Sequence, residues 1–152
     1  ITIAQIAETD IVVISMYGKN IYDYEKVTAY SYLANLHRCL SDMAPLLDGY
    51  SSAQRFIIAG DWNAGPQWNN RKSRKNFNFF ERLATFGLND CLGHFPDGEY
   101  EMTFKHNRNR QIDWMFSSPQ LNIREAHVER SFEIEDVSDH YPIITEFDIE
   151  KK

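Results

Sequence analysis

The sequence has 152 residues, 43% of them hydrophobic and 14% aromatic, which excludes a disordered tail and gives enough chain for one domain with a packed core. Its formal net charge of −6 argues against a generally basic protein that coats nucleic acid, although a local basic patch beside a bound metal ion can still oppose a phosphate. Cys39 and Cys91 lack the spacing of a zinc site or a disulfide framework, so we expect two free thiols, buried or half-buried.

The longest apolar stretches fall well short of the ~20 residues that cross a bilayer, so the sequence predicts no membrane span. No signal peptide pattern is visible, which favours an intracellular protein. The chain begins at Ile1 with a strand-like segment over residues 1–4 and no initiator Met. We therefore expect a fragment, a processed form or a truncated reading frame.

The first half of the chain alternates strands and helices. Residues 11–16 form a short β-branched apolar run, typical of a strand buried on both faces, and a turn follows at 17–20. Residues 25–44 predict a helix that ends near Pro45, because apolar side chains recur there at steps of three and four. These are Ala29, Leu33, Leu36, Leu40 and Met43. A second buried strand is expected over residues 55–59, with its exit at Gly60.

Residues 64–76 are polar and contain Gly65 and Pro66, which indicates a surface loop. A second helix is expected from about residue 76 to 86, with Phe80, Leu83 and Ala84 facing inward and Gly87 as its C-terminal cap. After a turn at 96–98, strands are expected near 100–104, 111–117, 123–130 and 142–148. No repeat or interdomain linker is visible, so the pattern predicts one domain over residues 1–152.

Acidic and amide side chains follow the second buried strand. Asp61 and Asn63 are two residues apart, so in an extended segment both project to the same side and face one pocket. The carboxylate can orient or deprotonate a water molecule, and the amide can fix that water or a phosphate oxygen. The alternative is an Asp-initiated turn in which both side chains bond to local backbone.

An Asp–His pair near the C-terminus adds a second chemistry. Asp139 suits a hard cation such as Mg²⁺, and His140 titrates close to neutrality, which suits proton transfer or a charged hydrogen bond to phosphate. Asp113 lies in an otherwise apolar strand, where an unpaired carboxylate is costly. We therefore expect Asp113 to pair with an imidazole, since a carboxylate commonly fixes the tautomer of a histidine.

Three motifs occur in order: Gly60-Asp61-Trp62-Asn63, Ile112-Asp113-Trp114 and Ser138-Asp139-His140-Tyr141-Pro142. With the helix that ends in Gly87-Leu88-Asn89-Asp90, they resemble the C-terminal motifs of the endonuclease/exonuclease/phosphatase superfamily over nearly the whole chain. The resemblance implies an α/β (α+β) fold: the C-terminal half of a two-sheet, four-layer α/β sandwich, with a mixed or antiparallel sheet and two main helices. It also implies a phosphoesterase that depends on Mg²⁺, with Mn²⁺ as the alternative ion.

The resemblance assigns roles residue by residue. Asp61 and Asn63 would align and activate the attacking water, Asn63 would also bind the phosphate, and Asp139 would contribute to the metal site. His140, oriented by Asp113, would contact the phosphate and act as acid, base or charge stabiliser. Two further phosphate contacts, Tyr17 and Asn20, match less closely because Lys19 replaces the usual proline; Tyr17 as a residue at the core edge is the alternative.

The resemblance also implies an N-terminal half with the principal metal-ligating glutamate, and nothing before Ile11 fits that role. We therefore expect an N-terminally truncated domain with reduced Mg²⁺ affinity. Its sheet would keep an apolar face uncovered, through which the chain could associate with a partner or a complementing half.

Two basic clusters are expected at the rim of the site, since the carboxyl ends of strands gather there. They comprise Arg71, Lys72, Arg74 and Lys75, and Lys105, His106, Arg108 and Arg110, with Trp68 or Phe104 available to stack on a base. Such clusters favour a nucleic acid substrate, although both can be ordinary solvated loops. A phosphomonoesterase or an inositol-phosphate or phospholipid hydrolase of the same superfamily is one alternative, and a catalytically incomplete binding half-domain is another.

Overall fold

The computed structural model describes residues 1–18, 31–49, 55–68, 75–96, 98–106, 110–131 and 137–149. Strands and helices alternate early and strands dominate late, as expected. The elements are β1 (Thr2–Gln5), β2 (Ile11–Ser15), α1 (Ser31–Gly49), β3 (Arg55–Asp61), the 3-10 turn η1 (Pro66–Trp68), α2 (Lys75–Ala84), β4 (Asn89–Asp90), β5 (Asp113–Ser117), β6 (Asn122–Val128) and β7 (Ile143–Asp148).

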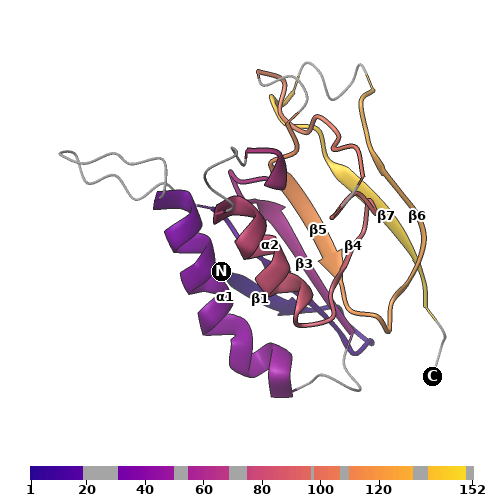
Figure 1. Ribbon diagram of the computed structural model, residues 1–152. Helices are drawn as coiled ribbons and strands as arrows, with labels where there is room; N and C mark the ends of the chain where they lie inside the picture. The colour runs from indigo at the N-terminus through magenta and orange to yellow at the C-terminus, as the bar shows by residue number, and fades with distance from the viewer. Residues whose placement is uncertain are drawn as a thin grey trace.

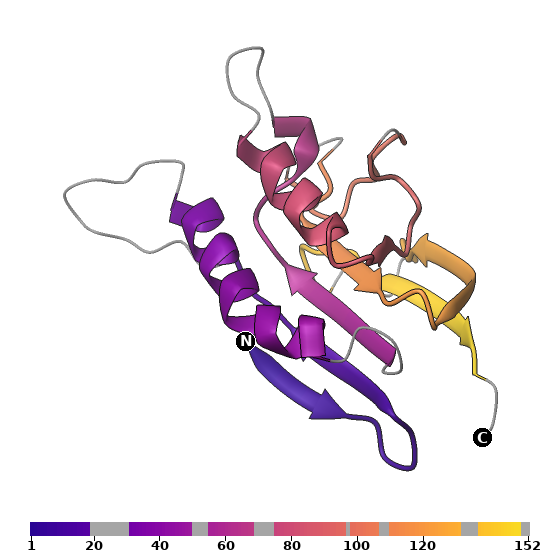
Figure 2. The same ribbon diagram turned by 60° about the horizontal axis from the view of Figure 1, so that its bottom comes forward.

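The strands form two sheets of unequal size. The larger sheet has the order β1-β2-β3-β5-β4, in which β2 and β3 are parallel and every other pair is antiparallel. β6 and β7 form an antiparallel pair. Helices α1 and α2 cover one face of the larger sheet, and the β6–β7 pair lies beside β5 on the side away from them (Figures 1 and 2). The predicted α/β architecture with a mixed sheet and two main helices is confirmed.

The core lies between the two helices and the larger sheet. Alternate residues of the central strands, including Ile14, Ile58 and Phe116, point to this face and are fully buried, as the two-residue period of a strand dictates. Opposite them lie the apolar faces of the helices, formed by Leu33, Leu36, Leu40, Met43 and Leu47 of α1 and Phe79, Phe80 and Leu83 of α2. Trp62 also enters this core and stacks on Phe116 at 5.5 Å between ring centroids.

Several sequence-based boundaries differ from the structure. Helix α1 continues through Pro45 to Gly49. Its buried residues Met43 and Leu47 lie on either side of the proline, and burying each contributes about 1.5–3 kcal/mol, enough to offset the ~3 kcal/mol cost of an internal proline. The expected start of this helix at residue 25 lies outside the described residues. At the C-terminal end of α2, Ala84 is exposed rather than inward.

The strand expected over residues 100–104 does not form; Phe104 makes only an isolated bridge to His140. The short strand β4, which pairs with β5 through Asn89 and Asp90, has no sequence signal. Both cysteines are free, Cys39 half-buried and Cys91 buried, as expected. Within the described part of the chain, neither helix is long and apolar enough to cross a membrane.

Candidate active site

Two carboxylates meet where β3 and β5 pair. In this antiparallel register Asp61, the last residue of β3, lies directly opposite Asp113, the first residue of β5. Both side chains are half-buried. Side chains alternate between the two faces of a strand, and Trp114, Phe116 and Ile58 are buried against the helices. Asp61 and Asp113 therefore project to the sheet face away from the helices. The site therefore lies at one edge of the open face of the sheet.

The exit from β3 is organised by Asp61 and Asn63. Oδ1 of Asp61 accepts the backbone N–H of Asn63 at 2.9 Å, and Nδ2 of Asn63 donates to Oδ2 of Asp61 at 2.9 Å. Asn63 has a φ of 49°, a left-handed conformation that asparagine tolerates better than most residues. The aspartate thus starts a local turn, one of the two sequence-based interpretations, and that turn rather than an extended segment brings the carboxylate and the amide together.

A glycine brings the end of β2 against this turn. The N–H of Gly18 donates to the backbone oxygen of Asp61 at 2.8 Å, and a Cβ on Gly18 would lie 1.9 Å from the backbone oxygen of Trp62. This close approach requires glycine and carries the preceding Tyr17, which is 56% exposed, to the same edge of the sheet. Asn20, its predicted companion, lies outside the described residues.

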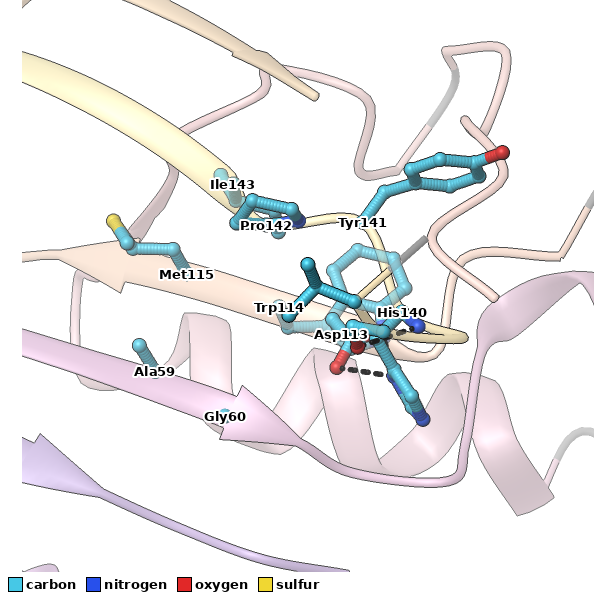
Figure 3. A pocket seen from close by; sticks show the side chains of 11 residues that line it. Ala59, Gly60, Asp113, Trp114, Met115, His140, Tyr141, Pro142 and Ile143 are labelled. Carbon is cyan, nitrogen blue, oxygen red and sulfur yellow. Dashed lines mark hydrogen bonds and ion pairs between the residues drawn. The ribbon is translucent and has the colours of Figure 1, made fainter. Parts of the chain in front are cut away.

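The imidazole of His140 binds Asp113. Nδ1 of His140 lies 2.9 Å from Oδ2 and 3.1 Å from Oδ1 of Asp113, and Figure 3 shows the ring turned toward that carboxylate. A carboxylate only accepts hydrogen bonds, so Nδ1 carries the proton and Nε2 remains for other contacts. The centroids of the Phe104 and His140 rings are 4.9 Å apart. The backbone N–H of His140 donates to Oγ of Ser138 at 3.0 Å.

Burial and charge shift the protonation of all three groups. Burial raises the pKa of Asp61 above 3.8, and this effect is larger than the lowering by the hydrogen bond from the Asn63 N–H. The charge of Asp113 raises the pKa of Asp61 further. Burial likewise raises the pKa of Asp113, against the hydrogen bonds from His140 and Thr103. Burial lowers the pKa of His140, but the hydrogen bond and charge of Asp113 and the charges of Asp61 and Asp139 raise it above 6.5 overall. These carboxylates thus stabilise the charged form of the imidazole relative to an isolated histidine.

A pocket of about 490 Å³ adjoins the Asp113–His140 pair (Figure 3). Its floor comes from β3 and β5 and its opposite wall from the segment that leads into β7. The lining residues are mostly apolar: Ala59, Gly60, Trp114, Met115, Val137, Tyr141, Pro142 and Ile143, with Asp113, Ser138 and His140 at one side. The Asp113 carboxylate and the His140 imidazole therefore border a space large enough for a small ligand.

The side chains near Asp139 do not make a metal site by themselves. Asp139 is exposed, whereas the other two carboxylates are engaged by Asn63 and His140. Nowhere in the described ranges do three or more His, Cys, Asp or Glu side chains converge as a metal centre requires. A single carboxylate does not fit the six oxygen ligands that Mg²⁺ prefers, so the described donors fall short of a magnesium centre.

The basic residues are described only in part. Arg110 is exposed and its backbone oxygen accepts the N–H of Thr103 at 3.2 Å; Lys105 is half-buried with its Nζ 5.4 Å from the ring centroid of Tyr141. Arg71 and Arg74 lie outside the described residues. Sequence reasoning missed Thr103, a buried residue whose hydroxyl binds the backbone at the start of β5. An isolated threonine in an apolar segment gives no signal of such a role.

The endonuclease-reverse transcriptase family matches residues 11–144. The chain therefore belongs to this family, and with it to the endonuclease/exonuclease/phosphatase superfamily, whose fold is that of deoxyribonuclease I. A comparison with curated protein sequences finds no significant match.

Solved structures share the fold at low sequence identity. A 3′ phosphatase from Neisseria bound to a product DNA hairpin is 20% identical with a TM-score of 0.65, covering 97% of this chain and 64% of that one. An AP endonuclease from Archaeoglobus fulgidus is 16% identical with a TM-score of 0.64, over 97% and 64%. A mannosyl-6-phosphatase from Bacteroides thetaiotaomicron is 17% identical with a TM-score of 0.53, over 91% and 51%. The chain thus spans less than two thirds of the length of these structures.

Proposed function

We propose that the protein is a phosphoesterase that hydrolyses phosphodiester bonds of nucleic acid by attack of an activated water molecule. The observation that carries the proposal is the geometry at the β3–β5 edge, where Asp61 lies opposite Asp113 and Asp113 binds Nδ1 of His140. Family membership over residues 11–144 supports the same chemical class. The Neisseria structure, which contains a DNA product, supports nucleic acid as the substrate.

In this proposal the oxygen of water forms a bond to phosphorus while the bond to the leaving oxygen breaks. Asp61 accepts the proton of the water, which Asn63 helps to orient; a raised carboxyl pKa makes Asp61 the stronger base. Nε2–H of the charged His140 donates to a phosphate oxygen and stabilises the negative charge that develops there. Asp113 fixes the ring orientation and favours its charged form without itself transferring a proton.

Magnesium dependence is part of the proposal, although no step above depends on the ion. Asp139 would supply one ligand, and the other described residues do not complete the set. Tyr17 and Asn20 would add phosphate contacts. The basic residues Arg71, Arg74 and Arg110 would contact the phosphates of nucleic acid as cations that release counterions.

The test is hydrolysis by the product of the complete reading frame that encodes this chain. Supercoiled plasmid, an abasic duplex and inositol phosphates are incubated with it, with and without EDTA, beside His140→Ala prepared in the same way. We expect DNA cleavage that EDTA abolishes and added Mg²⁺ restores, and little cleavage by the variant. Intact DNA in every condition would contradict the nuclease proposal.

A phosphomonoesterase is the second candidate, because the fold also matches a mannosyl-6-phosphatase with a TM-score of 0.53. Release of inorganic phosphate from inositol phosphates without any DNA cleavage would favour it. A third candidate is a non-catalytic half-domain, which the 64% coverage of the Neisseria structure supports. This candidate predicts that the 152-residue chain is inactive alone but associates, through its open sheet face, with a separately expressed N-terminal fragment of a homologous enzyme.

A further inference from the structure

Thr103 is buried at the point where three segments of the site meet. Its side chain has 0% exposure, and its Oγ1 accepts the backbone N–H groups of Ile112 and Asp113, each at 3.0 Å. These two N–H groups belong to the residues at which β5 begins. A single side-chain oxygen thus binds two consecutive backbone N–H groups at this point.

The backbone of Thr103 binds the other two segments. Its N–H donates to the oxygen of Arg110 at 3.2 Å, and its oxygen accepts the N–H of Tyr141 at 2.8 Å. The next two residues continue the contact, since the Lys105 N–H donates to the oxygen of Asp139 at 2.9 Å and the Phe104 ring lies against His140. Thr103 therefore connects the strand that carries Asp113 to the segment that carries His140.

The hydroxyl has one further capacity. A threonine hydroxyl accepts two hydrogen bonds and donates one, and both acceptor positions are used by backbone N–H groups. Its proton remains as a donor. The hydroxyl thus fixes the backbone on both sides of the Ile112–Asp113 peptide bond, from which the Asp113 carboxylate projects.

We infer that Thr103 is a positioning residue for the proposed hydrolysis: its hydroxyl fixes the backbone of Asp113, and through Asp113 the orientation and tautomer of His140. This inference rests on the proposed function for its kinetic consequence, but its structural consequence is independent of any activity. Loss of the hydroxyl would let the carboxylate move, and a misplacement of about 1 Å can cost on the order of 100-fold in rate.

Ser118 provides a matched control for a purely structural hydroxyl. Its Oγ accepts the backbone N–H of Phe56 at 2.9 Å, and its side chain is 4% exposed. Phe56 lies near the start of β3, at the opposite end of the strand from Asp61. Ser118→Ala therefore removes a comparable buried hydrogen bond without altering the surroundings of His140.

The experiment compares Thr103→Val, which keeps the shape, with Thr103→Ser, which keeps the hydroxyl, and with Ser118→Ala. The first readout is NMR of the His140 ring nitrogens at a pH high enough for the ring to be neutral, which reports the tautomer without substrate. We expect the wild type, Thr103→Ser and Ser118→Ala to show one tautomer protonated at Nδ1, and Thr103→Val to show a mixture. The second readout is kcat and KM on the DNA substrate, where Thr103→Val should lose at least ~10-fold in kcat with little change in KM.

A wild-type ring signal and wild-type kcat in Thr103→Val would overturn the inference, as would a loss in Thr103→Ser equal to that in Thr103→Val. If Thr103→Val does not fold, Thr103→Cys replaces it, because a thiol is only a weak hydrogen-bonding group. The same shift of the ring signal is expected there, and its absence overturns the inference. If no variant and no wild-type sample hydrolyses any phosphate ester, the proposed function fails while the ring signal still decides the role of Thr103.

Discussion

Asp61 and Asp113 lie directly opposite each other on adjacent strands, the final residue of β3 against the first residue of β5. Like charges at such positions destabilise a sheet. Burial raises the pKa of Asp61, and the charge of Asp113 raises it further. Asn63 and His140 compensate in part by binding one carboxylate each. The pair is thus better suited to chemistry than to the stability of the fold.

Asp61→Asn should therefore stabilise the protein while it reduces activity. Removing one of two opposed charges is worth about 0.2–1 kcal/mol, and the amide oxygen can still accept the Asn63 N–H. Turnover should fall by at least ~100-fold, the usual contribution of a general base. Urea unfolding and kcat, measured on the same preparation, test both halves.

The pH dependence of this stability difference has a defined sign. Burial raises the folded-state pKa of Asp61 above 3.8, so its protonated form stabilises the folded protein below that pH, and this stabilisation is lost as pH rises through the raised pKa. The advantage of Asp61→Asn should thus be present at neutral pH and shrink on acidification. Asp148→Asn serves as the control, because Asp148 is exposed and its carboxylate accepts a hydrogen bond from Asn122. Equal gains in both variants would contradict the account.

Gly18→Ala should destabilise the protein and displace the turn that follows β3. The new Cβ would lie 1.9 Å from the backbone oxygen of Trp62, and a backbone collision cannot be relieved by a rotamer change. Gly93→Ala is the control: its φ is 71° and nothing lies within 4 Å of the added Cβ, so it should cost only about 1 kcal/mol of left-handed strain. A melting temperature for Gly18→Ala at or above that of Gly93→Ala would show that the close approach is not required.

Cys91 should react slowly with thiol reagents in the folded protein. Burial raises the pKa of its thiol from 9.0 to about 11, and because thiolate is the reactive form, its thiolate fraction near pH 8 falls roughly 100-fold. A Cys39→Ser variant isolates this thiol. Labelling should be slow in buffer and fast in urea; fast labelling in buffer would contradict the burial of Cys91.

Much of the fold was predictable from local patterns. Strands β2 and β3 follow from their β-branched runs, and α2 from its apolar spacing and the Gly87 cap, because these signals depend on residues near in sequence. The contact of His140 with Asp113 was expected because a carboxylate in an apolar strand requires a partner, and the structure contains it. The catalytic roles of these residues stay predictions.

The failures share a physical cause, which is tertiary context. Helix α1 passes through Pro45 because Met43 and Leu47 are buried on either side of it. β4 exists because Asn89 and Asp90 pair with β5, from which they are distant in sequence. Residues 100–104 are apolar enough for a strand, yet Thr103 instead binds Arg110, the start of β5 and Tyr141, a junction that no local pattern encodes.

The most direct test of the account is a double-mutant cycle of kcat on DNA with Asp113→Asn, His140→Ala and the double variant. His127→Ala is the control, because His127 is a half-exposed histidine on β6 whose ring lies near Glu125 and Glu129. If the aspartate acts through the imidazole, each single variant should lose at least ~100-fold in kcat, and the double variant should lose no more than the worse of the two, because residues that act as one unit are not additive. Near-normal turnover in either single variant, or a double variant whose loss equals the product of the two, would contradict the claim that Asp113 and His140 form one catalytic pair.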